Sequence, residues 1–150
     1  MAEFTIRPAQ GSDLAFIFDT FLKSYKMSSP VGKACRNGIF FDNYRLILDD
    51  ILEHSKIYVA CHQDEPTVIF GYMIADGATL HYCFIKEVFR NLGVAKALYN
   101  EALKEADPMF GFLYTTHKTF HSDKIESFKV PYNPFRLYDA IRKREAHGTT

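Results

Sequence analysis

The stretch Arg90-Asn91-Leu92-Gly93-Val94-Ala95 separates an apolar run at 80–85 from a segment with helical periodicity at 94–106. The first turn of a helix has backbone N–H groups without partners, and the helix dipole adds partial positive charge there. Gly93 has no Cβ, so a diphosphate can approach the backbone closely. Arg90 adds guanidinium donors that suit phosphate oxygens. The pattern predicts an anion site at the start of a helix, and a simple tight turn at Gly93 is the alternative.

The spacing Arg-x-x-Gly-x-Ala resembles motif A of the GCN5-related N-acetyltransferases, the GNAT family, whose pattern is Arg/Gln-x-x-Gly-x-Gly/Ala. In that family, this loop binds the diphosphate of acetyl-CoA. The phosphate-binding patterns Gly-x-x-x-x-Gly-Lys-Ser/Thr and Gly-x-Gly-x-x-Gly do not occur in the sequence. The resemblance covers residues 80–106 in motif and residues 4–118 in the order of elements. The short chain also resembles small acetyltransferases encoded by bacteriophages.

The pattern of apolar residues predicts a strand, two helices, three strands, a helix and a last strand. The strands are nearly continuous in apolar residues, which is typical of a sheet covered on both faces. A helix joins the last two strands, which should therefore be parallel neighbours. We expect an α/β (α+β) fold with a mixed, mostly antiparallel central sheet and helices on both faces, and the resemblance implies the acyl-CoA N-acyltransferase (GNAT) fold. The expected strands are 4–7, 56–62, 67–75, 79–85 and 111–116, the expected helices are 14–25, 40–52 and 94–106, and a loop is expected at 27–38.

The composition restricts the class of protein. The chain has 150 residues, of which 47% are hydrophobic, so we expect one domain, 1–150, with a substantial core. A net charge of zero argues against a dedicated nucleic-acid partner. Three cysteines without a close pair do not form a disulfide framework. The sequence shows neither a signal peptide nor a run of ~20 apolar residues, so we expect a cytoplasmic protein without a membrane partner.

The resemblance also implies where acetyl-CoA binds. Two parallel strands that splay apart open a cleft at their C-terminal ends. In the family, the pantetheine arm enters this cleft, and a backbone N–H, here that of Ile85, donates to the thioester carbonyl, where a donor stabilises the developing negative charge. The backbone N–H groups from Leu92 to Lys96 would hold the diphosphate. The implied cofactor-binding residues are Phe84, Ile85, Arg90, Asn91, Leu92, Gly93, Val94, Ala95 and Lys96.

A histidine is the leading candidate for the general base. An alkyl amine has a pKa of ~10.4 and must lose a proton before it can attack a thioester. Strand alternation places residues 81, 83 and 85 on one face, so His81 should share the side of Ile85. Arylalkylamine acetyltransferases use a histidine at a similar offset before the motif arginine. A core histidine bonded to backbone is the alternative for His81, and His117 and His121 are further candidate bases.

The general acid is less well defined. The family often places a tyrosine on the helix after the fifth strand, but the corresponding position here is Phe128, which cannot donate a proton. Tyr132 and Tyr138 are the candidate acids, and ordinary packing is the alternative for both. Departure of the thiolate without an acid, or loss of catalysis, would also explain Phe128.

These observations predict an acetyl-CoA-dependent N-acetyltransferase that acts on a primary amine by direct attack in a ternary complex. The acceptor would be an amine-bearing small molecule or protein, bound between the N-terminal helices and the tail after residue 118. No zinc-type ligand spacing occurs, so we expect no metal, and nothing marks Cys83 as a nucleophile. The alternatives are an inactive acyl-CoA-binding protein and a protein-interaction module. The oligomeric state is open, with a homodimer as one option.

Overall fold

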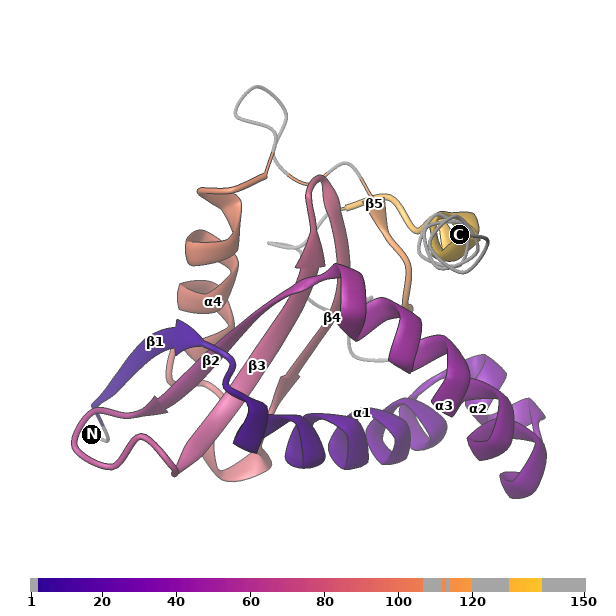
Figure 1. The fold of residues 1–150 in the computed structure, drawn as a ribbon, viewed down its shortest axis with the longest axis horizontal. Coiled ribbons are helices and arrows are strands. Elements are labelled where there is room, and N and C mark those ends of the chain that lie inside the picture. Colours follow the sequence, from indigo (N-terminus) through magenta and orange to yellow (C-terminus); the bar gives the residue numbers. More distant parts are fainter. Residues whose placement is uncertain (1–2, 107–111, 113, 120–129, 139–150) are drawn as a thin grey trace.

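The fold is a five-stranded sheet with helices on both faces (Figure 1). The computed structural model describes residues 3–106, 112, 114–119 and 130–138. The strands lie in the order β1-β2-β3-β4-β5; β1 to β4 are antiparallel, and β4 and β5 are parallel. The expected mixed, mostly antiparallel sheet is therefore confirmed. The elements are β1 Phe4–Pro8, η1 Gly11–Asp13, α1 Leu14–Ser28, α2 Pro30–Ala34, α3 Asn37–His54, β2 Lys56–His62, β3 Ile69–Asp76, β4 Thr79–Ile85, η2 Glu87–Phe89, α4 Val94–Leu103, β5 Tyr114–Thr115 and η5 Pro134–Arg136.

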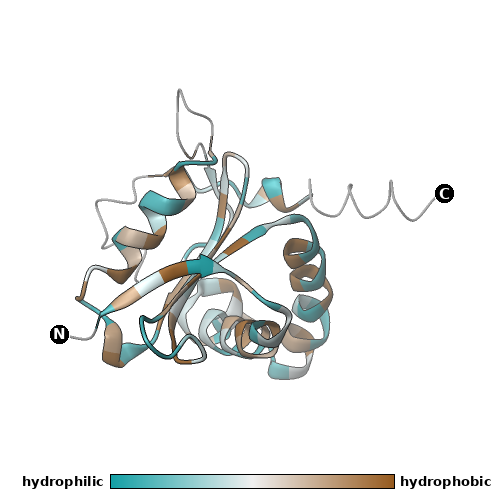
Figure 2. Cartoon of the chain, turned by 60° about the vertical axis from the view of Figure 1, so that its left-hand side comes forward, coloured by the Kyte–Doolittle hydropathy of each residue, from teal (hydrophilic) through white to brown (hydrophobic). Residues whose placement is uncertain are grey.

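Each face of the sheet has its own core, because successive residues of a strand point to opposite faces. Tyr72 and Ile74 of β3 pack with the apolar side of α1 and α3, whereas Met73 and Ala75 pack with α4. Figure 2 shows α4 on one side of the sheet and α1 and α3 on the other. The predicted helices 14–25, 40–52 and 94–106 are all present within α1, α3 and α4 or extend a few residues past their ends, and each helix buries one apolar face.

The segment 27–38 is not the predicted loop. α1 continues to Ser28, α2 follows, and α3 already begins at Asn37. Pro30 stands in the first turn of α2, where its missing N–H costs nothing, and the Ser29 hydroxyl accepts a hydrogen bond from the Gly32 N–H at 3.0 Å. A Cβ at Gly32 would lie 2.3 Å from a backbone oxygen of α1. The proline and glycine therefore serve as helix start and packing contact rather than as loop residues.

The bounds of β2 and β4 match the predictions, and several other boundaries differ by a few residues. β3 begins at Ile69 instead of residue 67, and α4 ends at Leu103 instead of residue 106. β5 covers Tyr114–Thr115, while residues 111 and 113 of the predicted strand lie outside the described residues. β4 and β5 are parallel neighbours, as expected from the helix that joins them.

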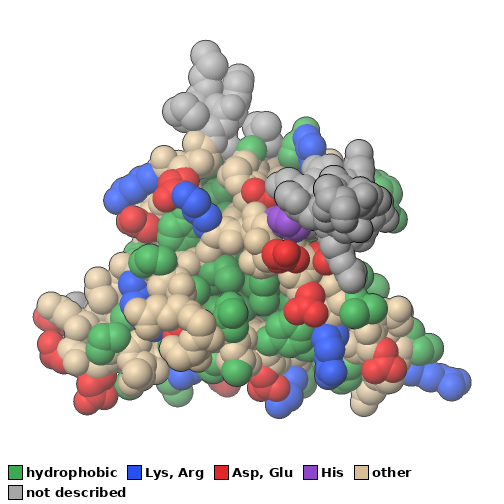
Figure 3. Space-filling model, in the orientation of Figure 1, with side chains coloured by type: hydrophobic (Ala, Val, Ile, Leu, Met, Phe, Trp, Pro, Cys, Tyr) green, Lys and Arg blue, Asp and Glu red, His purple; other side chains and the backbone are tan. Residues whose placement is uncertain are grey.

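The surface carries charges of both signs. Figure 3 shows hydrophobic side chains gathered over the middle of one face, with acidic and basic side chains interspersed around its edge. Within the described residues, no helix has the length and apolar character needed to cross a bilayer.

Candidate active site

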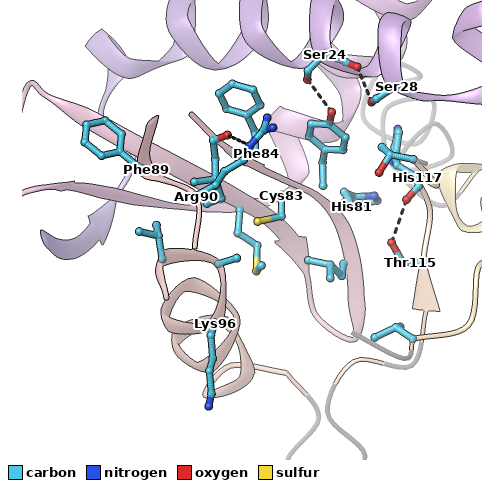
Figure 4. Close-up of a pocket in the computed structure, with 18 of the residues that line it drawn as sticks. Ser24, Ser28, His81, Cys83, Phe84, Phe89, Arg90, Lys96, Thr115 and His117 are labelled. Atoms are coloured by element: carbon cyan, nitrogen blue, oxygen red, sulfur yellow. Dashed lines mark hydrogen bonds between the residues drawn. The ribbon is translucent and has the colours of Figure 1, made fainter. Parts of the chain in front are cut away.

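β4 and β5 separate soon after they begin, and a cavity opens between them. The ladder consists of the pairs Thr79–Tyr114 and Leu80–Thr115, followed by a hydrogen bond from the Thr116 N–H to the Leu80 carbonyl at 3.2 Å. Beyond that point, β5 does not pair with the rest of β4 in the described part of the chain. The cavity has a volume of about 680 Å³ and is lined by α1, β4, the loop before α4 and the segment after β5 (Figure 4). The predicted splaying of the two strands is therefore present.

The loop at one end of the cavity exposes the start of α4. Asn91 and Gly93 have positive φ values of 65° and 80°, and Gly93 is the N-cap of α4. The first helical bond runs from the Ala97 N–H to the Gly93 carbonyl at 3.0 Å, so the preceding amides have no intrahelical acceptor. No described side chain caps this helix start. The geometry supplies a set of backbone donors next to the cavity.

Two contacts fasten this loop to the sheet. The Arg90 Nε donates to the Ile85 carbonyl at 3.1 Å, which ties the loop to the end of β4. Phe89 stacks on Phe70 with 3.8 Å between ring centroids and an interplanar angle of 5°. The loop end of the cavity is thus fixed to the sheet by a side-chain hydrogen bond and by an aromatic contact.

The free edge of β4 directs backbone groups into the gap beside β5. The Lys86 N–H bonds to the Phe70 carbonyl of β3 at 2.9 Å. Since successive N–H groups of a strand point to opposite sides, the Ile85 N–H points away from β3 and toward the open edge. The resemblance to the GNAT family implies the same direction, because there the corresponding N–H donates to the thioester carbonyl of a group bound in this gap.

Most of the predicted cofactor residues come together around the cavity. Figure 4 shows the Lys96 side chain directed away from the other labelled residues, so the backbone of Lys96 is the part near the helix start. Leu92 is 38% exposed and is not among the cavity-lining residues. The predicted residues that line the cavity are Phe84, Ile85, Arg90, Asn91, Gly93, Val94, Ala95 and Lys96.

The predicted acids and bases are placed very differently. His81 lines the cavity and is buried. Tyr132 and Tyr138 are 48% and 55% exposed and are not among the lining residues. Phe128 and His121 lie outside the described residues. No described tyrosine of the tail therefore reaches the cavity.

A β-bulge places His81. Ile74 of β3 pairs with Tyr82, but Ala75 pairs with Leu80, which leaves His81 as the extra residue on β4. Tyr82 belongs to the core under α1 and α3, whereas Leu80 belongs to the core under α4. Unbroken alternation would place Leu80 and Tyr82 on the same face of the sheet. Because the bulge breaks the alternation at His81, alternation no longer predicts that His81 shares the face of residue 85. Bulges are frequent next to active sites, where they redirect a side chain.

His81 belongs to a chain of buried hydrogen bonds. Its Nδ1 lies 2.8 Å from the Thr116 Oγ1, which lies 2.7 Å from Nδ1 of His117. The Nε2 of His117 lies 2.5 Å from the Tyr44 hydroxyl. Sequence reasoning named neither Thr116 nor Tyr44 as site residues. Thr116 could have been noticed beside a candidate histidine, but no sequence signal connects Tyr44 to it.

Burial controls the charge of the groups around this chain. Desolvation, followed by electrostatic repulsion from His81, lowers the pKa of His117 well below 6.5, so His117 is neutral at physiological pH. Burial raises the pKa of the Tyr44 hydroxyl, which stays protonated. Burial also raises the pKa of the Cys83 thiol to about 12, so this cavity residue is a poor nucleophile near neutral pH. Among the described residues, no three potential metal ligands gather in one place.

Comparison with known proteins identifies the fold. No protein-family model matches the chain, and no curated protein matches it. A fungal GCN5-related glucosamine N-acetyltransferase region matches with a TM-score of 0.51 and 16% identity, covering 69% of this chain and 12% of that multi-domain protein. A histone acetyltransferase HPA2 and related acetyltransferase from Corynebacterium glutamicum has a TM-score of 0.51 and 17% identity, covering 71% of this chain and 73% of that one. A transcriptional regulator from Bacillus halodurans has a TM-score of 0.52 and 17% identity, covering 84% and 89%. With its mixed sheet, its splayed β4 and β5 and its glycine-capped α4, this chain has the fold of the GCN5-related N-acetyltransferases.

Proposed function

We propose that this protein is an acetyl-CoA-dependent N-acetyltransferase that transfers an acetyl group to a primary amine. One observation carries the proposal: the exposed start of α4 and the free edge of β4 line the same cavity. Backbone donors at a helix start suit a diphosphate, and a free strand edge suits an extended arm that contains amides.

The residues present fit the bound group. A Cβ at Gly93 would have no heavy atom within 4 Å, so the space beside the loop backbone is open. The cavity volume of about 680 Å³ falls in the ordinary range for small-molecule sites. The cavity wall also includes apolar side chains such as Met73, Leu80 and Val130, which suit the aliphatic parts of a pantetheine arm.

The protein's own residues would bind acetyl-CoA, orient its thioester and accept a proton from the amine. Acetyl-CoA would supply the activated acetyl group. The Ile85 N–H would orient the thioester carbonyl, and the backbone N–H groups of Gly93 to Lys96 would hold the diphosphate. His81 would accept the proton of the attacking amine. The protonated Cys83 thiol supports direct transfer in a ternary complex, without a cysteine nucleophile.

The acceptor would be an amine-bearing small molecule or a protein amine. It would enter beside α1, where Ser24, Met27 and Ser28 line the cavity close to β4. This position leaves the loop end of the cavity to the diphosphate.

Thermal unfolding with added acetyl-CoA tests the binding part of the proposal. A ligand present at 100 times its Kd stabilises the native state by about 2.7 kcal/mol. We expect this stabilisation in the parent protein and its loss in Gly93→Glu, which adds bulk and negative charge. Gly77→Glu is the matched control, because Gly77 also has a positive φ and open space but lies in the turn between β3 and β4. Equal stabilisation of both variants by acetyl-CoA would show that the diphosphate does not bind at this loop.

Acyl-CoA binding without turnover is the second candidate function. The exposure of Tyr132 and Tyr138 favours it, because neither tyrosine lines the cavity as a general acid would. Release of free thiol from acetyl-CoA, measured across a panel of amines, separates the two functions. Stabilisation by acetyl-CoA without amine-dependent thiol release would select the second.

A further inference from the structure

The buried chain Tyr44–His117–Thr116–His81 starts in α3, crosses the segment after β5 and ends on β4 at the cavity (Figure 4 shows its two histidines). His81 is 2% exposed, Thr116 1% and His117 4%. Side chains that are buried to this degree keep fixed hydrogen-bond partners. The chain therefore constrains which ring nitrogen of each histidine carries a proton.

Several described titratable groups in and around this hydrogen-bond chain are uncharged near neutral pH. His117 comes from the segment after β5, and burial lowers its pKa well below 6.5. Burial raises the pKa of Tyr25 on α1 and of Tyr82 on β4 to about 12 each, and it also raises that of Tyr44 on α3. The thiol of Cys83, with a pKa of about 12, is neutral as well. The hydroxyls of Tyr25, Tyr44 and Tyr82 and the Cys83 thiol are therefore neutral around the chain near neutral pH.

The Thr116 hydroxyl limits this series of hydrogen bonds to two possible directions of donation. It has one proton and lies within hydrogen-bond distance of Nδ1 of both histidines, so it can donate to only one of them. If it donates to His81, that ring carries its proton on Nε2 and offers no lone pair to an amine. If it donates to His117, the His81 Nδ1–H donates to Thr116, and Nε2 of His81 is the basic nitrogen. His117 then carries its proton on Nε2 and donates to the Tyr44 oxygen.

Resting on the function proposed above, we propose that Thr116, His117 and Tyr44 are positioning residues that hold the His81 proton on Nδ1, so that Nε2 accepts the proton of the acceptor amine. One N–H bond of the acceptor breaks, and one Nε2–H bond forms. The resulting imidazolium keeps its Nδ1–H bond to Thr116, so no bond within the chain has to change. His81 passes the proton to solvent after the transfer.

Nitrogen-15 NMR of the histidine rings tests this assignment on the parent protein, without activity. The two ring nitrogens of a neutral histidine have distinct chemical shifts, and the protonated one is identified directly. We expect the proton on Nδ1 in His81 and on Nε2 in His117, with signals assigned by single substitutions. The opposite tautomer in His81 would overturn the proposal even if the protein proves to be an acetyltransferase.

Variants of Thr116 provide the second test. Thr116→Val keeps the shape but removes the acceptor, and we expect kcat to fall by roughly 10-fold to 100-fold while the Kd of acetyl-CoA is unchanged. The imidazolium loses a partner, so the rise of kcat with pH should move to lower pH by about one unit. Thr116→Ser retains the hydroxyl and should restore both properties, and Tyr44→Phe should give a smaller loss than Thr116→Val. Equal behaviour of the valine and serine variants would show that Thr116 only fills space.

Discussion

The two ends of the cavity are constructed in different ways. At the loop end, the donors are backbone amides of one short stretch around Gly93. At the histidine end, the polar groups come from three distant segments, and Tyr44 and His117 are 73 positions apart in the sequence. A site made of local backbone depends on conformation and tolerates changes of side chain. A site made of side chains from separate elements depends on each of its atoms. Substitutions at the two ends should therefore have separable effects.

The largest effect is expected from His81→Ala. A positioned general base contributes about 10²-fold to 10⁴-fold to a rate, so kcat should fall by at least 100-fold. The amides at the start of α4 are untouched, so stabilisation by acetyl-CoA should persist. Thiol release and thermal unfolding, measured on the same preparation, separate the two properties. If turnover is unchanged, His81 has no part in proton transfer and the contrast between the two ends disappears.

Gly71→Ala should disturb the loop end alone. Gly71 of β3 pairs with Ile85, and a Cβ there would lie 2.4 Å from the Phe84 carbonyl oxygen and 2.6 Å from the Ile85 Cδ1. Overpacking of this kind costs about 1–3 kcal/mol of stability and should displace the end of β4. We expect lower stability in chemical denaturation and weaker binding of acetyl-CoA.

Gly38→Ala is the control for this substitution. Gly38 lies in the first turn of α3, and a Cβ there would have no heavy atom within 4 Å. Alanine should therefore raise the free energy of unfolding by roughly 0.5 kcal/mol. A tolerated Gly71→Ala would mean that the β4 end moves easily and does not fix the loop.

His117 makes the histidine end sensitive to pH. The folded-state pKa of His117 lies well below 6.5, so the unfolded chain binds a proton more readily than the folded protein. This histidine's contribution to stability is complete above pH 6.5 and is lost as the pH falls toward the folded-state pKa. In that window, the loss approaches about 1.4 kcal/mol per pH unit. Chemical denaturation between about pH 7.5 and about pH 5 gives the free energy of unfolding as a function of pH. Its slope against pH should be shallower for His117→Gln than for the parent. Equal slopes would contradict a buried neutral His117.

The sequence predicted the local parts of this molecule well. The bounds of β2 and β4 match the predicted 56–62 and 79–85, because apolar runs between turn residues specify buried strands. The loop end of the cavity could be predicted for the same reason, since one contiguous motif contains the glycine turn and the helix start.

The histidine end could not be predicted because pairing between elements creates it. The bulge at His81 appears only when β4 is set against β3, and Tyr44 reaches His117 only when α3 packs on the sheet. α2 was missed for a related reason: Pro30 and Gly32 are common in loops, and only the contact with α1 reveals their role. Long-range contacts of this kind leave no periodic signal along the chain.

The sharpest test of the loop end comes from Gly93 itself. Its φ of 80° is unfavourable for alanine by roughly 1–2 kcal/mol, but asparagine tolerates this region, as Asn91 does in the same loop with a φ of 65°. Gly93→Ala should therefore lower the free energy of unfolding, and Gly93→Asn should lower it less. If the diphosphate approaches the backbone at this residue, both variants should bind acetyl-CoA more weakly than the parent, because both carry a Cβ. Restored stability without restored affinity in Gly93→Asn would assign Gly93 to the binding site. If asparagine restores both, the glycine serves only the turn, and the diphosphate has to be held elsewhere on the loop.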